Sequence, residues 1–426
     1  MTEQMNVPKL RFSEFNEALA RQTLEEVAEK IQDGTHFSPP LDEEGTCLYL
    51  TSKNIRNGFM LLEDISYISE LEHKKIYKRC DVKRGDVLLT KDGASTGNCC
   101  INTLDSEFSL LSSVAFIRAD ANHHNDFIYQ SIASQAGQKL IRGAISGQAI
   151  TRITLTKLRN FKFYFPTLPE QQKIASFLSK VDEKIALLVK KKDKLTEYKK
   201  GVMQQLFNGK WEEQDGQLTF ISPTLRFKAD DGSEFPDWEE KKLGSLADLT
   251  SSKRVYLSDY SEDGVPFFRG KEISEIRKGI IPDDVLYITR KAFEEFKSKY
   301  GAPVEGDILV TAVGTLANIV RVTGEFEFYF KDGNLIWLRK PRCDSKFLSI
   351  LMEANKHELL KTAIGSSQKA LTIVELKKIV FKMPSLEEQQ KITMFLSSLE
   401  EKVRLANSEL EKAKEWKKGL LQQMFV

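Results

Sequence analysis

One set of residues in this 426-residue chain has the types and spacing of a metal-dependent nuclease site. Pro282 and Asp283 are followed by Glu295 and Lys297, which matches a PD…ExK pattern. The carboxylates of such a site must converge on a divalent cation from a sheet. The stretch TRKAFEEFKSKY has helical periodicity instead, and a helix would aim Glu295 and Lys297 in different directions. Solvated helix charges are therefore favoured, and a nuclease is kept as the enzyme alternative.

The other chemistry-bearing residues do not form a recognisable catalytic motif. Five cysteines are present without a CxxC pair, so Cys99 and Cys100 are expected to be reduced thiols on opposite faces of a strand. His123 and His124 lie in a polar segment without further ligands at metal-binding spacing. The sequence contains neither GxxxxGK[ST] nor GxGxxG. We therefore expect no enzyme activity and no metal or cofactor bound by this chain itself.

The composition is typical of a globular protein. It does not indicate a protein that binds DNA mainly by covering the phosphates with basic residues. The net charge is only +2, whereas proteins that bind DNA mainly through phosphates usually carry a strong basic excess. Any DNA-binding face must therefore come from local patches. No apolar run of about 18 residues occurs, so we expect no membrane contact and a cytoplasmic location.

The chain repeats itself with an offset of 218 residues. Residues 166–207 and 384–425 align without a gap, share EQQKI near their starts, and are identical at half of their positions. Upstream, RGDVLLT matches EGDILVT, and PKLRF matches PTLRF. Each half is therefore expected to be one mixed segment followed by one long helix.

Heptad spacing of apolar residues in both long segments predicts a coiled coil. Thr167 and Ser385 precede the segments as candidate N-caps, with Glu170 and Glu388 at capping-box spacing. Lys192, Lys199 and Lys417 interrupt the seam. The predicted seam residues are Ile174, Leu178, Val181, Ile185, Leu188, Leu195, Val202, Leu206, Ile392, Leu396, Leu399, Val403, Leu410, Leu420 and Met424.

Short β-like runs and helical stretches over 127–141 and 346–364 give the rest of the chain an α+β character. The predicted fold class is therefore α+β with a pseudo-two-fold internal repeat. The predicted boundaries are 1–165 for domain 1, 166–209 for helix 1, 210–240 for a linker, 241–383 for domain 2 and 384–426 for helix 2.

Polar loops beside β-runs recur at matching places in both halves. They combine Lys and Arg, which suit phosphate or guanine, with Asn, Gln, Ser and Thr, which suit base edges. The candidate DNA contacts in these loops are Lys53, Asn54, Arg56, Lys91, Ser95, Thr96, Gln148, Arg152, Lys253, Arg254, Arg269, Lys271, Gln368 and Lys369.

The doubled layout resembles the specificity (S) subunit of type I restriction-modification systems. A variable segment is followed by P-x-L-x-EQQKI and a long helix, twice, and the resemblance covers essentially the entire chain. It implies that the two mixed segments are target recognition domains, each of which reads one half of a split double-stranded DNA target, and that the long helices separate them as an antiparallel coiled coil. It also implies two methyltransferase (M) subunits and restriction (R) subunits as partners, which use adenosylmethionine, ATP and Mg²⁺. The candidate methyltransferase-docking residues are Glu170, Gln171, Gln172, Glu388, Gln389 and Gln390.

The two halves differ in ways that make the target asymmetric. The helices are half identical and suit equivalent partner sites, whereas the recognition segments share only scattered residues. Because the two recognition segments differ, we expect them to bind different DNA half-sites at a fixed spacing. The resemblance implies host defence as the biological role. A coiled-coil scaffold that binds only protein is the second alternative.

Overall fold

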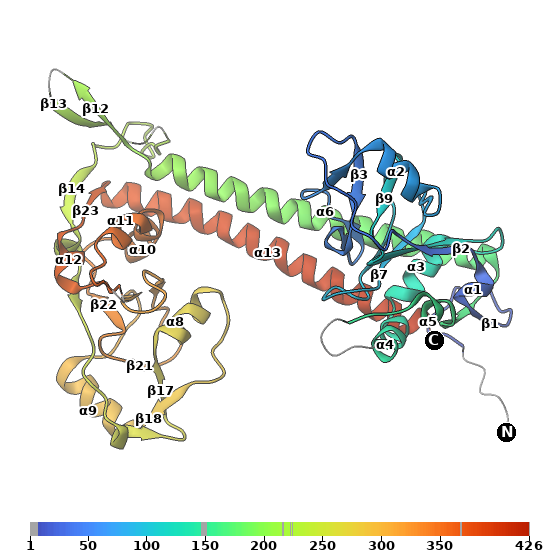
Figure 1. Ribbon diagram of the computed structural model, residues 1–426. Helices are drawn as coiled ribbons and strands as arrows, with labels where there is room; N and C mark the ends of the chain where they lie inside the picture. Colours follow the sequence, from blue (N-terminus) through green and yellow to red (C-terminus); the bar gives the residue numbers. More distant parts are fainter. Residues whose placement is uncertain are drawn as a thin grey trace. The chain divides into compact units, whose positions relative to one another are not determined.

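The computed structural model contains two compact units (Figure 1). Unit 1 comprises Met1–Lys192 and Leu405–Val426, and unit 2 comprises Asp193–Arg404. Each unit therefore takes parts of both long helices, whereas the predicted boundaries treat the helices as separate segments. The structure describes residues 7–145, 151–214, 217–221, 223, 225–366 and 369–425.

A four-stranded sheet of order β2-β10-β7-β8 separates two hydrophobic clusters in unit 1. Val87 and Leu89 belong to one cluster and Leu88 to the other, because successive side chains of a strand point to opposite faces. Cys99 and Cys100 divide in the same way, as predicted, and both are free thiols. The strands of this sheet are β2 (Ala28–Asp33), β7 (Val87–Thr90), β8 (Cys99–Ile101) and β10 (Val114–Ala119).

Smaller sheets flank the central one. The order β6-β3-β9 combines an antiparallel and a parallel pair, and β1 pairs with β11. These strands are β1 (Ala20–Thr23), β3 (Cys47–Leu50), β4 (Ile55–Arg56), β5 (Phe59–Met60), β6 (Ser66–Ile68), β9 (Phe108–Leu110) and β11 (Lys162–Phe165).

The helix predicted over 127–141 is two helices in the structure. Ser134 ends the first and caps the second, where its hydroxyl accepts a hydrogen bond from the Gly137 amide at 3.1 Å. Gly137 lies so close to the preceding helix that a Cβ would be 2.3 Å from the Ser131 carbonyl oxygen. The short helices of unit 1 are α1 (Leu24–Val27), α2 (Glu70–Tyr77), α3 (Asn125–Ala133), α4 (Gln135–Ala144) and α5 (Leu155–Arg159).

Unit 2 repeats this topology. Its central sheet has the order β15-β22-β19-β20, and a second sheet has the order β16-β18-β17-β21, in which β17 and β21 are parallel as β3 and β9 are. Its strands are β14 (Glu239–Lys242), β15 (Asp248–Thr250), β16 (Tyr260–Ser261), β17 (Val265–Phe268), β18 (Leu286–Ile288), β19 (Ile308–Thr311), β20 (Ile319–Arg321), β21 (Tyr329–Phe330), β22 (Leu335–Arg339) and β23 (Val380–Met383).

Helices in unit 2 follow the repeat as well. The region predicted as one helix over 346–364 is again split in two, at Asn355. The stretch around Glu295 is helical, as predicted. The short helices are α7 (Leu243–Leu246), α8 (Gly270–Arg277), α9 (Arg290–Tyr300), α10 (Ser345–Ala354), α11 (Lys356–Lys361) and α12 (Ile373–Lys378). The predicted linker 210–240 contains two strands, β12 (Lys210–Gln214) and β13 (Gln217–Ile221), which pair antiparallel, and β14 begins at its end.

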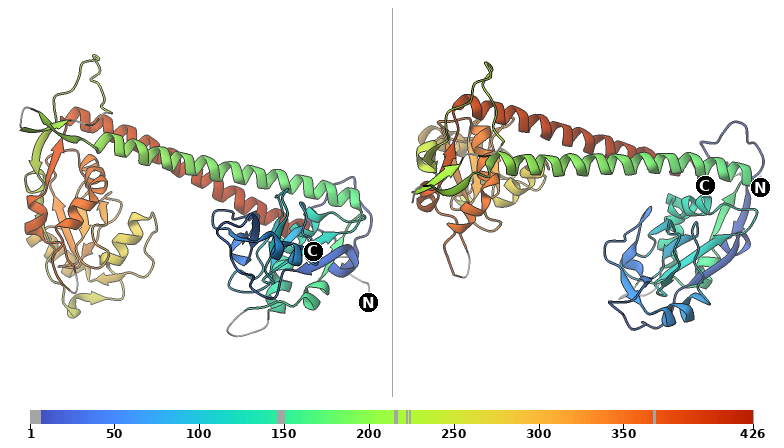
Figure 2. Two further views of the ribbon diagram at one scale, coloured as in Figure 1. Left: turned by 45° about the horizontal axis from the view of Figure 1, so that its top comes forward. Right: turned by 90° about the horizontal axis from the view of Figure 1, so that it is seen from above.

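The two long helices, α6 (Leu168–Phe207) and α13 (Leu386–Met424), run side by side and antiparallel within each unit (Figure 2). In unit 1 Lys417 pairs with Asp182 at 2.6 Å and Lys191 with Glu409 at 3.0 Å. In unit 2 Lys199 pairs with Glu400 at 3.1 Å. Two of the lysines that interrupt the heptads are therefore neutralised across the seam.

The ends of the seam belong to the domain cores. Ile174, Leu178 and Val181 are buried with α3 and with the end of α13, and Ile392 and Leu396 are buried in the core of unit 2. Leu399, Val202, Leu206, Leu410, Leu420 and Met424 are also buried. The remaining predicted seam residues are half-buried, namely Ile185, Leu188, Leu195 and Val403. In the described part of the chain, no helix is long and apolar enough to cross a membrane.

Candidate nucleic-acid interface

In unit 1 the repeated EQQKI segment is bonded to the N-terminal arm. We call this set of contacts, made by Arg11, Glu170 and Gln171, the latch. Glu170, 1 % exposed, accepts two hydrogen bonds of 2.7 Å from Nε and Nη2 of Arg11, which belongs to the repeated PKLRF segment. Gln171 donates to the Pro166 carbonyl at 2.9 Å and accepts from the His124 amide at 3.0 Å. The latch therefore ties the arm, the start of α6 and the start of α3 together.

Unit 2 contains the same latch at the equivalent positions. Arg226 donates to the fully buried Glu388 at 3.1 and 2.8 Å. Gln389 donates to the Pro384 carbonyl at 2.8 Å and accepts from the Asp344 amide at 3.1 Å. Hydrogen bonding to Glu388 outweighs burial and raises the pKa of Arg226. The predicted N-cap Ser385 is confirmed, because its hydroxyl accepts a hydrogen bond from the Glu388 amide at 3.3 Å. The carboxylates of Glu170 and Glu388 are held by the guanidinium groups and not by the reciprocal bond of a capping box.

The latch corrects the predicted docking surface. Glu170, Gln171, Glu388 and Gln389 are buried and hydrogen-bonded within their own units, so they do not present a surface to a partner. Gln172 and Gln390 are exposed on the same helix turns. The docking prediction is therefore kept for these two glutamines only.

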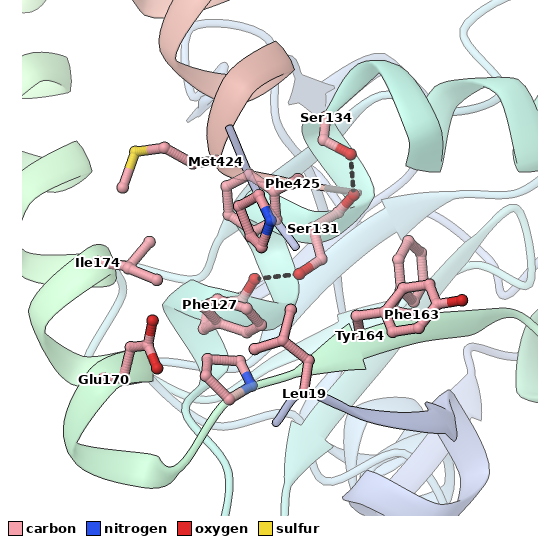
Figure 3. A pocket seen from close by; sticks show the side chains of 12 residues that line it. Leu19, Phe127, Ser131, Ser134, Phe163, Tyr164, Glu170, Ile174, Met424 and Phe425 are labelled. Atoms are coloured by element: carbon pink, nitrogen blue, oxygen red, sulfur yellow. Dashed lines mark hydrogen bonds between the residues drawn. The ribbon is translucent and has the colours of Figure 1, made fainter. Parts of the chain in front are cut away.

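Figure 3 shows a cavity beside the unit 1 latch, where Phe127, Phe163 and Ile174 meet the end of α13. Its volume is about 20 Å³. Such a space holds about one water molecule, so it is a packing gap rather than a site for adenosylmethionine.

Three candidate loops of unit 1 converge at one end of its central sheet. The loop after β3 contacts the loop after β7 through Ser95 Oγ, which donates to the Ser52 carbonyl at 3.4 Å. The loop after β7 contacts the segment before α5, where the Gly93 amide donates to the Thr151 carbonyl at 3.0 Å. Thr96 also donates to the Gly93 carbonyl at 2.6 Å. Segments distant in sequence therefore form one polar surface.

The structure separates surface residues from buried ones within this cluster. Lys53 and Arg152 are exposed, and Arg56, Ser95 and Thr96 are half-buried. Asn54 is a wrong prediction, because its side chain is 1 % exposed and bonds the Leu61 and Asp64 carbonyls. Lys91 is wrong for a similar reason: it is buried between Asp33 at 3.4 Å and Asp92 at 3.2 Å. Gln148 lies outside the described residues.

The candidate loops of unit 2 converge in the same way. The Lys331 amide donates to the Phe268 carbonyl, and the Leu371 amide donates to the Ala312 carbonyl, both at 2.9 Å. Ser251 Oγ donates to the Leu335 carbonyl at 3.2 Å. The loops after β15 and β17 therefore both contact the connection between β21 and β22. The loop after β19 contacts the same connection, where the Ala312 amide donates to the Asn334 carbonyl at 2.8 Å, and it also contacts the segment before α12.

Most candidate cations of unit 2 reach the surface. Lys253, Arg254, Lys271 and Lys369 are exposed, and Arg269 is half-buried. Arg254 lies 3.5 Å from Asp332, and Lys271 lies 2.9 Å from Asp284. Exposed pairs of this kind contribute little to stability, so both cations can exchange a carboxylate for a phosphate. Gln368 lies outside the described residues.

Sequence reasoning missed the carboxylates that hold two of these arginines. Asp92 accepts from Nε and Nη2 of Arg152 at 3.0 and 3.3 Å. The fully buried Glu272 holds Arg269 at 2.5 Å. The i,i+3 spacing of Arg269 and Glu272 was a visible signal, whereas Asp92 and Arg152 are 60 positions apart and meet only in the fold.

The nuclease-like residues do not converge in the structure. Glu295 accepts from Lys299 at 2.6 Å on the surface of α9, and Lys297 donates to Glu327 at 2.6 Å. Both pairs are solvated, as the favoured interpretation of the sequence predicts. Among the described residues, no group of three His, Cys, Asp or Glu side chains is placed to hold a metal ion.

Comparison with known proteins identifies the repeated unit. The family described as the type I restriction modification DNA specificity domain matches residues 18–197 and 236–415. The MjaVIII specificity subunit of a type I restriction enzyme from Methanocaldococcus jannaschii is 26% identical over 395 residues, which cover 89% of this chain and 85% of that protein.

Two solved structures share the fold over nearly the whole chain. The S subunit of a type I restriction-modification system from M. genitalium superposes with a TM-score of 0.56 at 16% identity, and 99% of each chain is covered. A chain solved in work on complex assembly and conformational transition of the type I R-M system gives a TM-score of 0.55 at 16% identity, covering 95% of this chain and 97% of that one. With two matched copies of the specificity domain, this chain belongs to the family of type I restriction-modification specificity subunits.

Proposed function

We propose that this chain reads a split, asymmetric DNA target and directs adenine methylation or restriction by partner subunits, without catalysing either reaction. The observation that supports this most is that polar, cation-bearing loops meet at equivalent places in two units of the same topology, as the equivalent bonds from Ile153 to Lys91 and from Leu371 to Ala312 illustrate. Each cluster would contact one half of the target, with exposed lysines and arginines on phosphates and polar side chains on base edges.

The two clusters differ in their side chains, which supports unlike half-sites. The Lys91 and Ala312 amides make equivalent hydrogen bonds, to the Ser113 and Asn334 carbonyls, so the loops after β7 and β19 start from the same backbone position. The first of these loops presents half-buried Ser95 and Thr96, whereas the second presents exposed Thr315 and half-buried Leu316. A shared scaffold with different side chains would read different bases, so the target would not be palindromic.

The proposed assembly contains two methyltransferase subunits and restriction subunits, which would supply adenosylmethionine, ATP and Mg²⁺ chemistry. The paired helices, with Gln172 and Gln390 exposed near their starts, would offer two equivalent docking sites. A cytoplasmic location would accompany this role.

Mapping of methylated adenines in the host genome tests the proposal. We expect one split, asymmetric motif that loses methylation when this gene is deleted and regains it when the gene is restored. Methylation that is unchanged by deletion would contradict the proposal. A protein-only scaffold would instead be indicated if the chain bound its partners but the complex selected no sequence. DNA cleavage by the purified chain with Mg²⁺, abolished by Asp283→Ala, would favour the nuclease alternative.

A further inference from the structure

Arg269 differs from the other exposed cations of unit 2 because the fold fixes its guanidinium. Nη2 donates to Glu272 Oε1 at 2.5 Å, and Nε donates to the same oxygen at 3.2 Å. The other oxygen, Oε2, accepts from the Arg269 amide at 2.6 Å. One carboxylate therefore holds both the backbone and the Nε–Nη2 edge of this arginine.

The Glu272 carboxylate is itself buried and stays ionised, so its hydrogen bonds to Arg269 are fixed in place. Its side chain is 0 % exposed and lies in the first turn of α8, where a helix favours negative charge. Burial alone would raise the pKa of Glu272, but the hydrogen bonds from Arg269 outweigh that effect and lower it. The carboxylate thus stays ionised, and the side chain of Arg269 stays anchored at its inner edge.

The outer part of Arg269 is accessible, and its backbone lies next to a candidate loop. Its side chain is 32% exposed, and Nη1 donates no hydrogen bond to any residue that the structure describes. The neighbouring Gly270 would place a Cβ 3.8 Å from both the Thr311 side chain and the Val313 carbonyl, so Arg269 adjoins the loop after β19. The Nη1–Nη2 edge is the fork that bonds guanine O6 and N7 in the major groove.

We propose that Arg269 reads a guanine in the half of the DNA target that unit 2 contacts, and that Glu272 is its positioning residue. This inference rests on the proposed function. A guanidinium fixed before binding loses little rotamer entropy on contact, which suits base selection. Lys253, Arg254 and Lys271 are exposed and have at most solvated partners, so they suit phosphates instead, where geometry matters less.

Unit 1 contains a parallel arrangement. Asp92, whose side chain is 12% exposed, holds the Nε–Nη2 edge of Arg152 at 3.0 and 3.3 Å, and Lys91 contacts the same carboxylate at 3.2 Å. Asp92 in unit 1 and Glu272 in unit 2 are different residue types and lie at different positions of the fold. A carboxylate-held arginine therefore occurs in both loop clusters, although no sequence motif connects them.

The test is sequence selection by the full complex. The chain, its cognate methyltransferase subunits and adenosylmethionine are incubated with DNA whose second half-site is randomised, and the methylated molecules are sequenced. We expect wild type to select a G·C pair in that half-site. Arg269→Gln should reduce this selection about 5- to 150-fold at that position, because a bidentate arginine contributes about 1–3 kcal/mol of discrimination. The first half-site should not change.

Two further variants separate reading from folding. Arg269→Lys keeps a cation near Glu272 but lacks the fork, so it should also lose guanine selection while retaining more affinity. Glu272→Gln should weaken selection at the same position by a smaller factor. Arg290→Gln is the matched control, because Arg290 is an exposed, ion-paired arginine on α9 of the same unit; it should leave selection intact.

The inference is overturned if wild type selects no G·C pair in that half-site. It is also overturned if R269Q and R269K weaken methylation equally on all sequences, as loss of a phosphate contact would. A wild-type complex that selects no sequence at all would contradict the proposed function itself, so the two failures are distinguishable.

Discussion

The side chains that the two halves share most closely stabilise the fold, and those that differ lie in the candidate reading loops. Arg11 with Glu170 and Arg226 with Glu388 occupy equivalent positions and make equivalent hydrogen bonds. Their repetition therefore follows from a structural requirement at the helix starts. A repeated polar motif is by itself no sign of a partner-binding surface.

Loss of the Arg226–Glu388 ion pair in unit 2 should lower the free energy of unfolding. Glu388→Ala leaves the Arg226 guanidinium, whose side chain is 15% exposed, without its carboxylate. We expect the free energy of unfolding to fall by about 3–5 kcal/mol, as for other broken buried ion pairs. Denaturant titration of the purified chain measures it. Glu400→Ala, which removes only an exposed partner of Lys199, should cost less than about 1 kcal/mol; similar losses for both variants would contradict the latch.

Thiol reactivity should follow burial. Burial raises the pKa of Cys80 and of Cys100 to about 12. Because the thiolate is the nucleophile, only about one such thiol in ten thousand is reactive at pH 8. Iodoacetamide should therefore label half-buried Cys47 first in the folded chain, as read by mass spectrometry of peptides. Unfolded chain, in which all five cysteines label, is the control. Rapid labelling of Cys100 before unfolding would contradict the burial described.

Sequence could indicate the loops but not the exposure of each side chain within them. Lys91 and Asn54 have the residue types of DNA contacts, yet both satisfy buried partners. The difference depends on Asp33 and on the Leu61 and Asp64 carbonyls, which no local pattern connects to these positions. Side-chain direction at loop ends is set by tertiary contacts, so it had to come from the structure.

At the level of elements, periodic segments were predicted well and interrupted ones less well. The heptads predicted α6 and α13 nearly to their ends. The break at Ser134 was missed because apolar spacing continues across it, while the cap and the close approach of Gly137 are local stereochemistry. The helix seam was predicted as a separate coiled coil, whereas its ends are parts of the two domain cores.

Because the ends of α6 belong to the domain cores, we expect Leu→Ala substitutions to destabilise the protein more at those ends than in the middle of the helix. Leu178 is fully buried in the unit 1 core, and Leu195 is half-buried. Leu178→Ala should reduce the free energy of unfolding by about 2–5 kcal/mol, and Leu195→Ala by about 1 kcal/mol, because less apolar area is lost. Thermal and denaturant unfolding of both variants measure the difference. Equal losses would indicate a uniform coiled coil instead.

The whole molecule consists of two units with the same topology, and each unit carries its own cluster of candidate DNA-binding loops. The net charge of +2 gives no general basic surface, so the proposed DNA binding would depend on the two loop clusters. The central sheets repeat strand for strand, although the sequences between the motifs share little. Weak repeats such as GDVLLT and GDILVT predicted this duplication, because both mark the strand that precedes a reading loop.

Helix length should set the spacing of the two half-sites. Inserting matched whole heptads into α6 and α13, near Lys191 and Glu409, keeps the antiparallel register. We expect the methylated motif to retain both half-sites and gain base pairs between them, about 3 for each added ~10 Å. Sequencing of methylated DNA gives the spacing directly. An unchanged gap would show that the helices do not determine it.

Exchange of one domain would show whether each unit reads its half of the target independently. Residues 20–160, which hold all the described unit 1 loops, are replaced by the corresponding segment of another specificity subunit, and the methylated motif is sequenced with the complete complex. We expect one half of the motif to change and the other half to stay as in wild type. A motif that changes in both halves, or in neither, would contradict independent reading by two units.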